Sequence, residues 1–171
     1  MHLPKFVAIA ACDPLGVIGK GGRLPWHCPE DLEHFYRSTL DQVIIMGYQT
    51  FSSLPDRVFQ NRHCFVFTQN HTIDKEGVVP IGHLKELEDF YSSHPTLWGK
   101  TNFVIGGSRI FELFFREHLI EVALMTHMRT LYEGDSYFPL HYIASWSEKT
   151  LCTGLNFAIH LHTKKEAKDE S

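Results

Sequence analysis

Short apolar runs alternate along this chain with segments of helical spacing, and the alternation limits the folds it can adopt. Residues 5–12, 42–46, 63–68 and 102–105 are each nearly continuous in hydrophobic side chains, many of them β-branched. Such runs are typical of strands that are buried on both faces, as in a parallel sheet. The helical segments between them supply the crossovers that parallel strands require.

The remaining patterns complete one domain. Further strands are predicted at residues 77–80, 121–127, 146–152 and 157–162, and helices at residues 50–54, 84–91 and 109–115 and from Pro29 onward. We therefore predict an α/β fold: a single domain with a central, mostly parallel twisted sheet of about eight strands, helices on both faces and a C-terminal antiparallel hairpin. This domain takes up residues 1–163, and the charged tail 164–171 is expected to be frayed.

Composition narrows the class of protein. The chain has 171 residues, 43% hydrophobic and 21% charged, which is typical of a soluble globular protein. The net charge of −4 argues against a general nucleic-acid binder, and no apolar run has the length of a membrane span. We expect a cytoplasmic monomer that binds a small molecule, without a signal peptide and without nucleic-acid or membrane partners.

Potential metal ligands are scattered. Cys12, Cys28, Cys64 and Cys152 form no C-x-x-C pair, so reduced thiols are expected and a zinc site is not. Of the twelve histidines, two lie two residues apart near the C-terminus and would share one face of a strand, His160 and His162. A metal site needs further ligands that the sequence does not place. A polar strand face is the favoured interpretation, and no metal is predicted.

Asp31 is the acid most able to carry chemistry. It begins an amphipathic helix, precedes Leu32, lies four residues before Phe35 and follows the glycine-rich loop 13–28. One interpretation is an N-terminal acid that favours the helix dipole. The other is a carboxyl group in an apolar pocket, where its pKa is raised and it can hold a proton near neutral pH. The helix has no obvious cation to pair with it.

Glycines mark two strand-to-helix turns. Gly106-Gly107 follows one buried strand, and Gly47, with Thr50 beyond it, follows another. Neither turn is G-x-G-x-x-G, so each could be a simple tight turn, but together they suit a ligand with two phosphate-bearing ends at the carboxyl edge of the sheet.

Three further side chains have two interpretations each. Arg57 and Arg62 are either solvated or suited to a carboxylate on a ligand, and Trp26 is either core or a pocket wall with one N–H donor. The residues alone thus indicate an α/β enzyme that binds a nucleotide-like cofactor and uses one acidic residue.

The motifs, taken in order, resemble those of the dihydrofolate reductase family. The matching segments are Gly16-Val17-Ile18-Gly19, Leu24-Pro25-Trp26, Pro29-Glu30-Asp31-Leu32-Glu33-His34-Phe35, Ile45-Met46-Gly47, Thr50-Phe51, Arg62, Val104-Ile105-Gly106-Gly107, Met125-Thr126 and Glu133-Gly134-Asp135-Ser136-Tyr137-Phe138-Pro139. They cover nearly the whole chain, and their shared order makes the set specific.

The resemblance implies reduction of 7,8-dihydrofolate to tetrahydrofolate by hydride from NADPH, which feeds one-carbon and thymidylate metabolism. Asp31 would bind the pterin and assist protonation of N5, supported by Thr126 through water, while the loop around Leu24 closes over the nicotinamide. The implied catalytic residues are Asp31, Trp26, Leu24 and Thr126. The implied substrate-binding residues are Val7, Ala8, Asp31, Leu32, Phe35, Leu54, Arg57, Arg62, Ile105 and Thr126. Antifolates such as trimethoprim or methotrexate are expected to bind.

The resemblance also implies a cofactor site and a cis Gly106–Gly107 peptide. The implied cofactor-binding residues are Ile9, Ile18, Gly19, Gly47, Tyr48, Gln49, Thr50, Thr68, Gln69, Gly106, Gly107, Ser108, Arg109, Ile110 and Phe111. Two positions depart from the family: Tyr48 stands where Arg or Lys is usual, and Gln69 follows Thr68 where Arg or a small hydroxyl residue is frequent. Because neutral donors bind a phosphate dianion less strongly than cations do, weaker discrimination of NADPH over NADH is expected.

Two other functions fit part of this pattern. A related reductase of flavin synthesis, which acts on a ribosylated pyrimidine, shares fold and cofactor but is not expected to carry the Leu24-Pro25-Trp26 loop followed by Asp31. A catalytically silent nucleotide-binding or regulatory protein would be supported by an altered Asp31 or a broken Gly106-Gly107, and both are intact.

Overall fold

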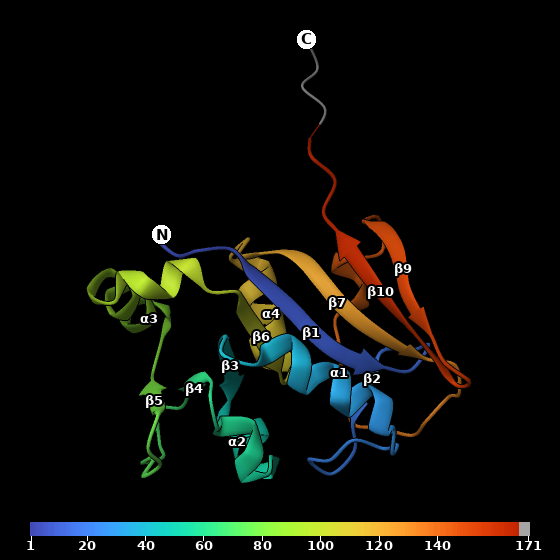
Figure 1. Ribbon diagram of the computed structural model, residues 1–171, viewed down its shortest axis with the longest axis horizontal. Coiled ribbons are helices and arrows are strands. Elements are labelled where there is room, and N and C mark those ends of the chain that lie inside the picture. Colours follow the sequence, from blue (N-terminus) through green and yellow to red (C-terminus); the bar gives the residue numbers. More distant parts are fainter. Residues whose placement is uncertain (168–171) are drawn as a thin grey trace.

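A twisted eight-stranded sheet forms the centre of the structure, a computed structural model that describes residues 1–167 (Figure 1). The strands of this sheet are β1 (Phe6–Cys12), β3 (Val43–Gly47), β4 (His63–Phe67), β5 (Val78–Ile81), β6 (Asn102–Gly106), β7 (Ile120–Met128), β9 (Ser147–Thr153) and β10 (Phe157–Thr163). The α-helices are α1 (Pro29–Thr39), α2 (Tyr48–Ser53), α3 (Leu84–Ser93) and α4 (Ser108–Arg116). Three 3-10 turns, η1 (Asp56–Phe59), η2 (Pro95–Gly99) and η3 (Leu140–Tyr142), complete the helical segments.

The strand order is β5-β4-β3-β6-β1-β7-β10-β9. Every neighbouring pair is parallel except those of β10, which runs antiparallel to both β7 and β9. The predicted fold class is therefore confirmed, including the C-terminal antiparallel hairpin. The chain order reverses around β1 and β6, so the turns that leave β3 and β6 open at the same carboxyl edge, where α/β folds bind ligands.

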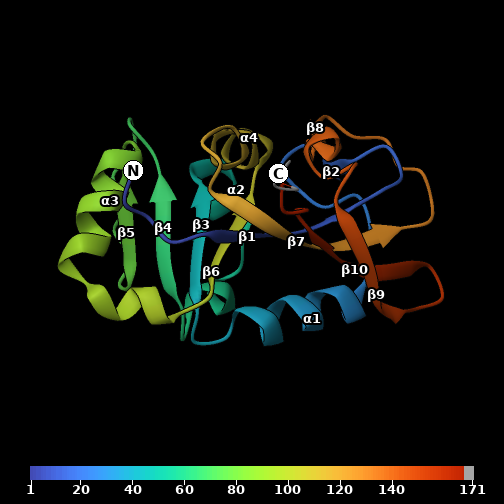
Figure 2. The same ribbon diagram turned by 90° about the horizontal axis from the view of Figure 1, so that it is seen from above.

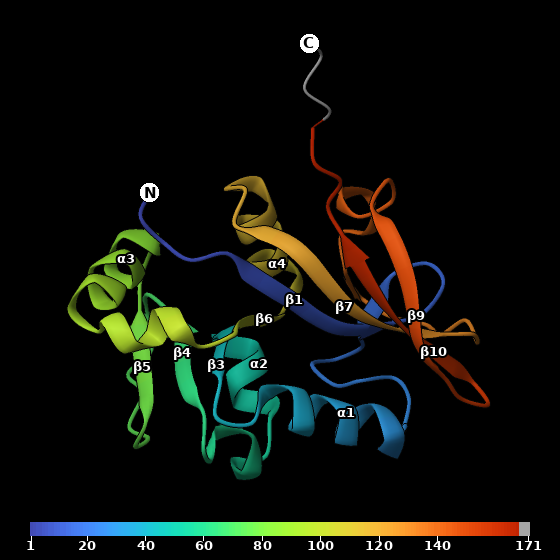
Figure 3. The ribbon, with the colours of Figure 1, turned by 45° about the horizontal axis from the view of Figure 1, so that its top comes forward.

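Helices cover both faces of this sheet (Figure 2). In β3, Val43 and Ile45 pack with α3 and α4, whereas Ile44 and Met46 pack with α1 and η1, and all four are fully buried. This two-sided burial explains why the strand is a continuous apolar run without a polar alternation. Along the α1 side, β1 and β7 lie next to the helix that carries Asp31 (Figure 3).

The glycine-rich loop is anchored outside the main sheet. Its strand β2 (Val17–Gly19) pairs with β8 (Ser136–Tyr137). The fully buried Asp13 carboxylate accepts the backbone N–H groups of Leu15, Val17 and Tyr132, each at 2.9 Å. A Cβ on Gly134 would lie 2.3 Å from Val17 Cγ1, so only glycine allows this close approach. The loop that contains Leu24 is thus held at its base.

Element bounds differ from prediction by one or two residues. The helix expected from Thr50 starts at Tyr48, because Gly47 is its N-cap, and the last strand extends to Thr163. Lys164 N–H then donates to the Glu121 carbonyl at 2.9 Å, so pairing passes the predicted domain end by one residue. The frayed tail was predicted for residues 164–171, and residues 168–171 lie outside the described residues. The four cysteines are free thiols, and no helix within residues 1–167 is long and apolar enough to cross a membrane.

Candidate active site

A carboxylate and a hydroxyl meet between α1 and β7. Pro29 occupies the first turn of α1, which places Asp31 at the start of the helix, and the Thr126 hydroxyl donates to Asp31 Oδ1 at 2.6 Å. The two residues are 95 positions apart. The contact is direct, which corrects the expectation of a bridging water: β7 brings Thr126 within hydrogen-bond distance of the carboxylate.

Burial controls the charge of this site. It raises the pKa of Asp31 above its ordinary value, while the hydrogen bond from Thr126 and the nearby His34 lower it in part. The net direction agrees with the interpretation of a carboxyl group in an apolar pocket, which is easier to protonate than an exposed aspartate. Asp31 can therefore hold or pass a proton closer to neutral pH than an exposed aspartate.

His34 was missed as a neighbour of Asp31. Its pKa is lowered, chiefly by burial, and its Nε2 is buried without a hydrogen-bond partner among the described residues. A lowered pKa leaves His34 mostly neutral near pH 7, so the expectation that α1 offers Asp31 no obvious cation is not overturned, although the ring is a polar neighbour that was not expected. The three-residue spacing, which places both side chains on one helix face, was a signal that could have identified the pair.

Apolar side chains line the region next to Asp31. Val7, Ile9, Phe35, Leu54 and Ile105 belong to one cluster on the α1 side of the sheet. These five, each expected from the resemblance to contact the substrate or the cofactor, are therefore brought together on one face of the sheet.

Two predicted wall residues behave differently. Leu32 is 45% exposed, so it borders open space and does not fill the core. The Ala8 side chain is fully buried in the cluster beneath α3 and α4, on the opposite face. Because neighbouring residues of a strand point to opposite faces, Ala8 can present only its backbone to a ligand near Asp31.

In the loop that precedes α1, Leu24 is exposed and Trp26 is buried. Leu24 is 53% exposed, as suits a residue that closes over a ligand. Trp26 is buried and its ring centroid lies 5.1 Å from that of Tyr132. Its Nε1 is buried without a partner among the described residues, so it combines a core contact with a free donor.

Arg62 is held at the far end of α1. Its guanidinium donates to the Tyr36 and Gln60 carbonyls and to Thr39 Oγ1, at 2.7–2.9 Å. Arg57 lies over the Tyr36 ring, 3.9 Å from the centroid. Arg62 lies 5.5 Å from the same centroid, so two positive charges gather here; burial, together with Arg57, lowers the pKa of Arg62. Such a pair suits a carboxylate.

The two glycine turns meet because β3 and β6 are neighbours. Met46 pairs with Gly106, and a Cβ on Gly47 would lie 3.2 Å from Ile110 Cγ1. Thr50 Oγ1 lies 3.6 Å from the place of a Cβ on Gly107. The Gly106–Gly107 peptide is cis, as the resemblance implies. The two turns therefore lie side by side.

The N-terminus of α4 is suited to an anion. Its N-cap, Gly107, makes no side-chain cap, and its first turn, which includes Ser108 and Arg109, carries no acid. The positive end of the helix dipole is therefore left for a ligand. Phe111 is buried against Gly106, and β2 places Gly19 in a buried position. Ile18 packs at the margin of the core.

The expected phosphate position beyond β4 contains a histidine that sequence reasoning missed. The His71 ring stacks on Tyr48 with centroids 3.7 Å apart, and His71 N–H donates to Thr68 Oγ1 at 3.2 Å. Gln69 donates to the Gly82 carbonyl at 3.4 Å. A hollow of about 380 Å³ lies here, lined by Thr68, Gln69, His71, Pro80, Ile81, Gly82, His83 and Glu86. Gln49 is exposed on α2.

Comparison with known proteins identifies the family. The sequence matches the family described as dihydrofolate reductase over residues 5–154. This chain belongs to the dihydrofolate reductase family. It is 34% identical over 135 residues to the dihydrofolate reductase of Lactococcus lactis, covering 78% of this chain and 77% of the relative. The enzyme of Bacillus subtilis is 33% identical over 138 residues, covering 81% and 77%.

A solved structure agrees with these sequence matches. The dihydrofolate reductase of Enterococcus faecalis, complexed with NADP(H) and RAB-propyl, superposes with a TM-score of 0.76 at 26% identity, covering 95% of this chain and 97% of that one. The chain is accordingly an NADPH-dependent oxidoreductase of the dihydrofolate reductase family. These matches favour this family over the two alternative functions.

Proposed function

We propose that Asp31 is the residue through which this dihydrofolate reductase assists protonation of N5 as 7,8-dihydrofolate becomes tetrahydrofolate. The observation that supports this role is the Asp31–Thr126 hydrogen bond in a site that raises the pKa of the carboxyl group. A carboxylate that accepts from Thr126 on one oxygen keeps the other for the pterin. Reduction of a C=N bond needs a proton source and orientation, and it needs no protein nucleophile.

The substrate is proposed to lie between Asp31 and the arginine pair. The Val7 and Ile105 carbonyls face the pterin, and the apolar residues Phe35, Leu54 and Leu32 contact its aromatic portion. Arg62, whose guanidinium is oriented by three hydrogen bonds, binds the glutamate carboxylate with Arg57 nearby. Orientation before binding lowers the entropy cost of this contact.

NADPH, when bound, supplies the hydride. We expect the two glycine turns and Thr50 to hold the cofactor. The uncapped N-terminus of α4 would stabilise the negative charge of its pyrophosphate. Ile9, Ile18 and Gly19 border the nicotinamide, and closure of the loop at Leu24 excludes water. Trp26, in the same loop as Leu24, offers its Nε1–H as a hydrogen-bond donor.

Weaker discrimination of NADPH over NADH is proposed from Tyr48, Gln69 and Thr68. Tyr48 stacks on His71, and Gln69 and Thr68 offer only neutral hydrogen-bond donors to the phosphate. The test is the ratio of kcat/KM for NADPH to that for NADH. Gln69→Arg should raise this ratio about tenfold, since a charge-assisted hydrogen bond adds about 1.4 kcal/mol. A very large NADPH preference in the unaltered enzyme would contradict the proposal.

The central experiment follows NADPH oxidation with dihydrofolate across pH for the unaltered chain and Asp31→Asn. The substitution should lower kcat mainly at neutral pH, because the pterin must then acquire its proton without help. An unchanged pH–rate profile would refute the role of Asp31. NADPH binding without any dihydrofolate-dependent oxidation would instead support a silent binding protein.

The assembly and location expected from the sequence remain part of this proposal. The enzyme is proposed to act as a cytoplasmic monomer, with residues 1–163 as its catalytic domain. Antifolates such as trimethoprim or methotrexate should compete with dihydrofolate near Asp31. Sedimentation at micromolar concentration and inhibition kinetics test these two points.

A further inference from the structure

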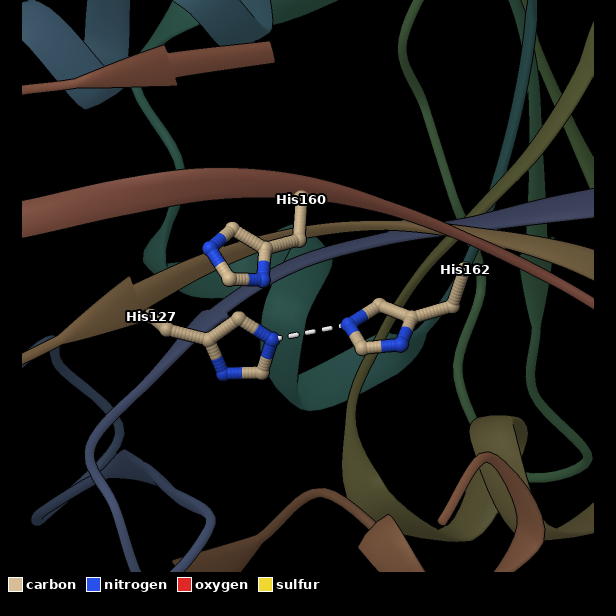
Figure 4. A group of neighbouring side chains, drawn as sticks. All are labelled: His127, His160 and His162. Atoms are coloured by element: carbon tan, nitrogen blue, oxygen red, sulfur yellow. Dashed lines mark hydrogen bonds between the residues drawn. The ribbon is translucent and has the colours of Figure 1, made fainter. Parts of the chain in front are cut away.

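Three histidines, His127, His160 and His162, converge on one face of the sheet (Figure 4). His127 lies on β7, and His160 and His162 lie on its antiparallel neighbour β10. The pairing of Ala158 with His127 places all three imidazoles on one face, because alternate residues of a strand share a face. Thr126, the preceding residue, points to the active site instead. The cluster is therefore separate from the catalytic groups.

Distances within the cluster fit a metal ion. One ligand atom from each histidine can be chosen so that all three lie within 4.8 Å of one another, and the Nε2 atoms of His127 and His162 are 2.9 Å apart. A tetrahedral zinc ion binds imidazole nitrogen at about 2.0–2.1 Å, which separates its ligands by about 3.4 Å. The 2.9 Å spacing is shorter than this value and the remaining pairs lie within the 4.8 Å limit, so small side-chain rotations suffice.

Groups outside the cluster orient the rings. Glu148 of β9 lies against His160 Nδ1, and its other oxygen is 3.9 Å from His162 Nδ1. Cys12 Sγ is 3.9 Å from His127 Nδ1. When a metal ion replaces the hydrogen bond between the Nε2 atoms of His127 and His162, the proton of each ring moves to Nδ1, on the side of Cys12 or Glu148, and the Nε2 lone pair becomes free for the ion. Outer carboxylates play this part for metal-bound histidines in general.

Protonation states agree with this arrangement. Burial, with His162 and His160 nearby, lowers the pKa of His127 to about 4, and burial also lowers that of His162. Both rings are neutral at pH 7, the form that binds metal. Burial and Asp13 raise the pKa of Cys12 to about 12, so this thiol stays protonated and acts as a neighbour, not a ligand.

We propose that His127, His160 and His162 form a binding site for a divalent first-row transition metal ion, with Zn²⁺ the best match. Imidazole ligands suit Zn²⁺, Co²⁺ or Ni²⁺ and do not suit Mg²⁺ or Ca²⁺. Water occupies the fourth position, reached from the side where Glu148 is 49% exposed. The ion links β10 to β7 and stabilises the C-terminal hairpin.

The first test is titration of the chelator-treated chain with Zn²⁺ and Co²⁺. One equivalent of Zn²⁺ should bind at about micromolar concentration or tighter, and Co²⁺ should give the intense visible bands of a tetrahedral nitrogen site. Zinc at about 100 times its Kd should raise Tm by about 5 °C or more, because it binds only the folded chain.

The variant His160→Asn/His162→Asn should lose at least 100-fold in zinc affinity and lose the Tm increase. The matched control, His2→Asn/His63→Asn, removes two exposed histidines elsewhere and should bind like the unaltered chain. Glu148→Gln keeps all three ligands and should weaken binding about tenfold. Retained dihydrofolate reduction shows that the double variant is folded.

A measurement on the unaltered chain does not depend on any variant. Imidazole ¹⁵N resonances of three of the twelve histidines should shift on addition of Zn²⁺. Equal affinities for the double variant and the unaltered chain would overturn the proposal. So would thiolate-to-cobalt charge-transfer bands, which would place the metal on cysteine, or no binding at stoichiometric Zn²⁺.

Discussion

Adjacent residues of β7 face two different environments. Thr126 points to α1 and donates to Asp31, whereas His127 points to the other face and donates to or accepts from His162. Burial is the leading cause of the pKa shifts on both faces: it raises the pKa of Asp31 and lowers those of His127 and His162. In each case burial shifts the pKa toward the neutral form, but a neutral acid can supply a proton while a neutral imidazole can bind a metal.

The difference teaches that strand alternation can separate two chemistries by a single residue. One face presents one carboxyl group, with a hydroxyl partner, beside an apolar wall. The other face presents three imidazoles, with the Glu148 carboxylate beside them. Substitutions on one face should therefore leave the other face unchanged, and this independence can be tested.

Crossed substitutions should produce the largest effect. Asp31→Asn should lower kcat at pH 7 by about 10²–10³, since proton transfer contributes about that factor, while zinc affinity stays within about twofold. The double variant His160→Asn/His162→Asn should instead lose zinc affinity and keep its kcat. Steady-state NADPH oxidation and zinc titration of both variants provide the comparison. Either substitution changing both readouts would break the separation of the faces.

Thr126→Val should act on the first face alone. The hydroxyl stabilises the charged form of Asp31, so its loss should raise the pKa of that carboxyl group further. We expect kcat near neutral pH to change about tenfold and the pH–rate profile to move to higher pH. Thr130→Val, which removes the exposed hydroxyl bonded to Asn156, is the control. A profile identical to that of the unaltered enzyme would contradict the direct Thr126–Asp31 contact.

The two faces should respond oppositely when stability is measured against pH. The folded pKa of Asp31 lies above its ordinary 3.8, so its contribution is fully present below that value and is lost as pH rises through the folded pKa. The folded pKa of His127 is about 4 against 6.5, so its contribution is present above 6.5 and is lost as pH falls toward 4.

Two variants make this response measurable by urea unfolding with a chelator present. Asp31→Asn should be more stable than the unaltered chain at pH 7. His127→Gln should flatten the loss of stability between pH 6.5 and 4 by about 1–2 kcal/mol, a value reduced for partial solvent exposure. Parallel curves for all three proteins would show that burial does not control these charges.

The smallest effect is expected from His34→Gln. The nearby imidazole lowers the pKa of Asp31, so its removal should move the pH–rate profile upward by less than Thr126→Val does, with kcat at pH 7 within about threefold. His94→Gln, at an exposed residue between α3 and η2 that is far from Asp31 along the chain, serves as the control. A larger shift than that of Thr126→Val would make His34 the principal partner of Asp31.

Local patterns predicted most of the fold, because buried parallel strands and amphipathic helices have recognisable periods. The strand at residues 102–105 and the Gly106-Gly107 turn lie where expected. Helix starts were less certain: α2 begins at Tyr48, where the short helix has no side-chain cap to mark it. Of the residues expected to contact the substrate, the Ala8 side chain lies in the cluster on the opposite face of the sheet.

The sequence by itself determined the element types and the family resemblance, and it singled out Asp31 as the candidate acid. Only the tertiary structure decided which distant residues meet. Thr126 reaches Asp31 directly across 95 positions, and His127 joins His162 across 35. The physical reason is strand register. The pairing of β7 with β10 depends on the packing of the whole sheet, and a register shift of one residue would turn every side chain of the shifted strand to the opposite face.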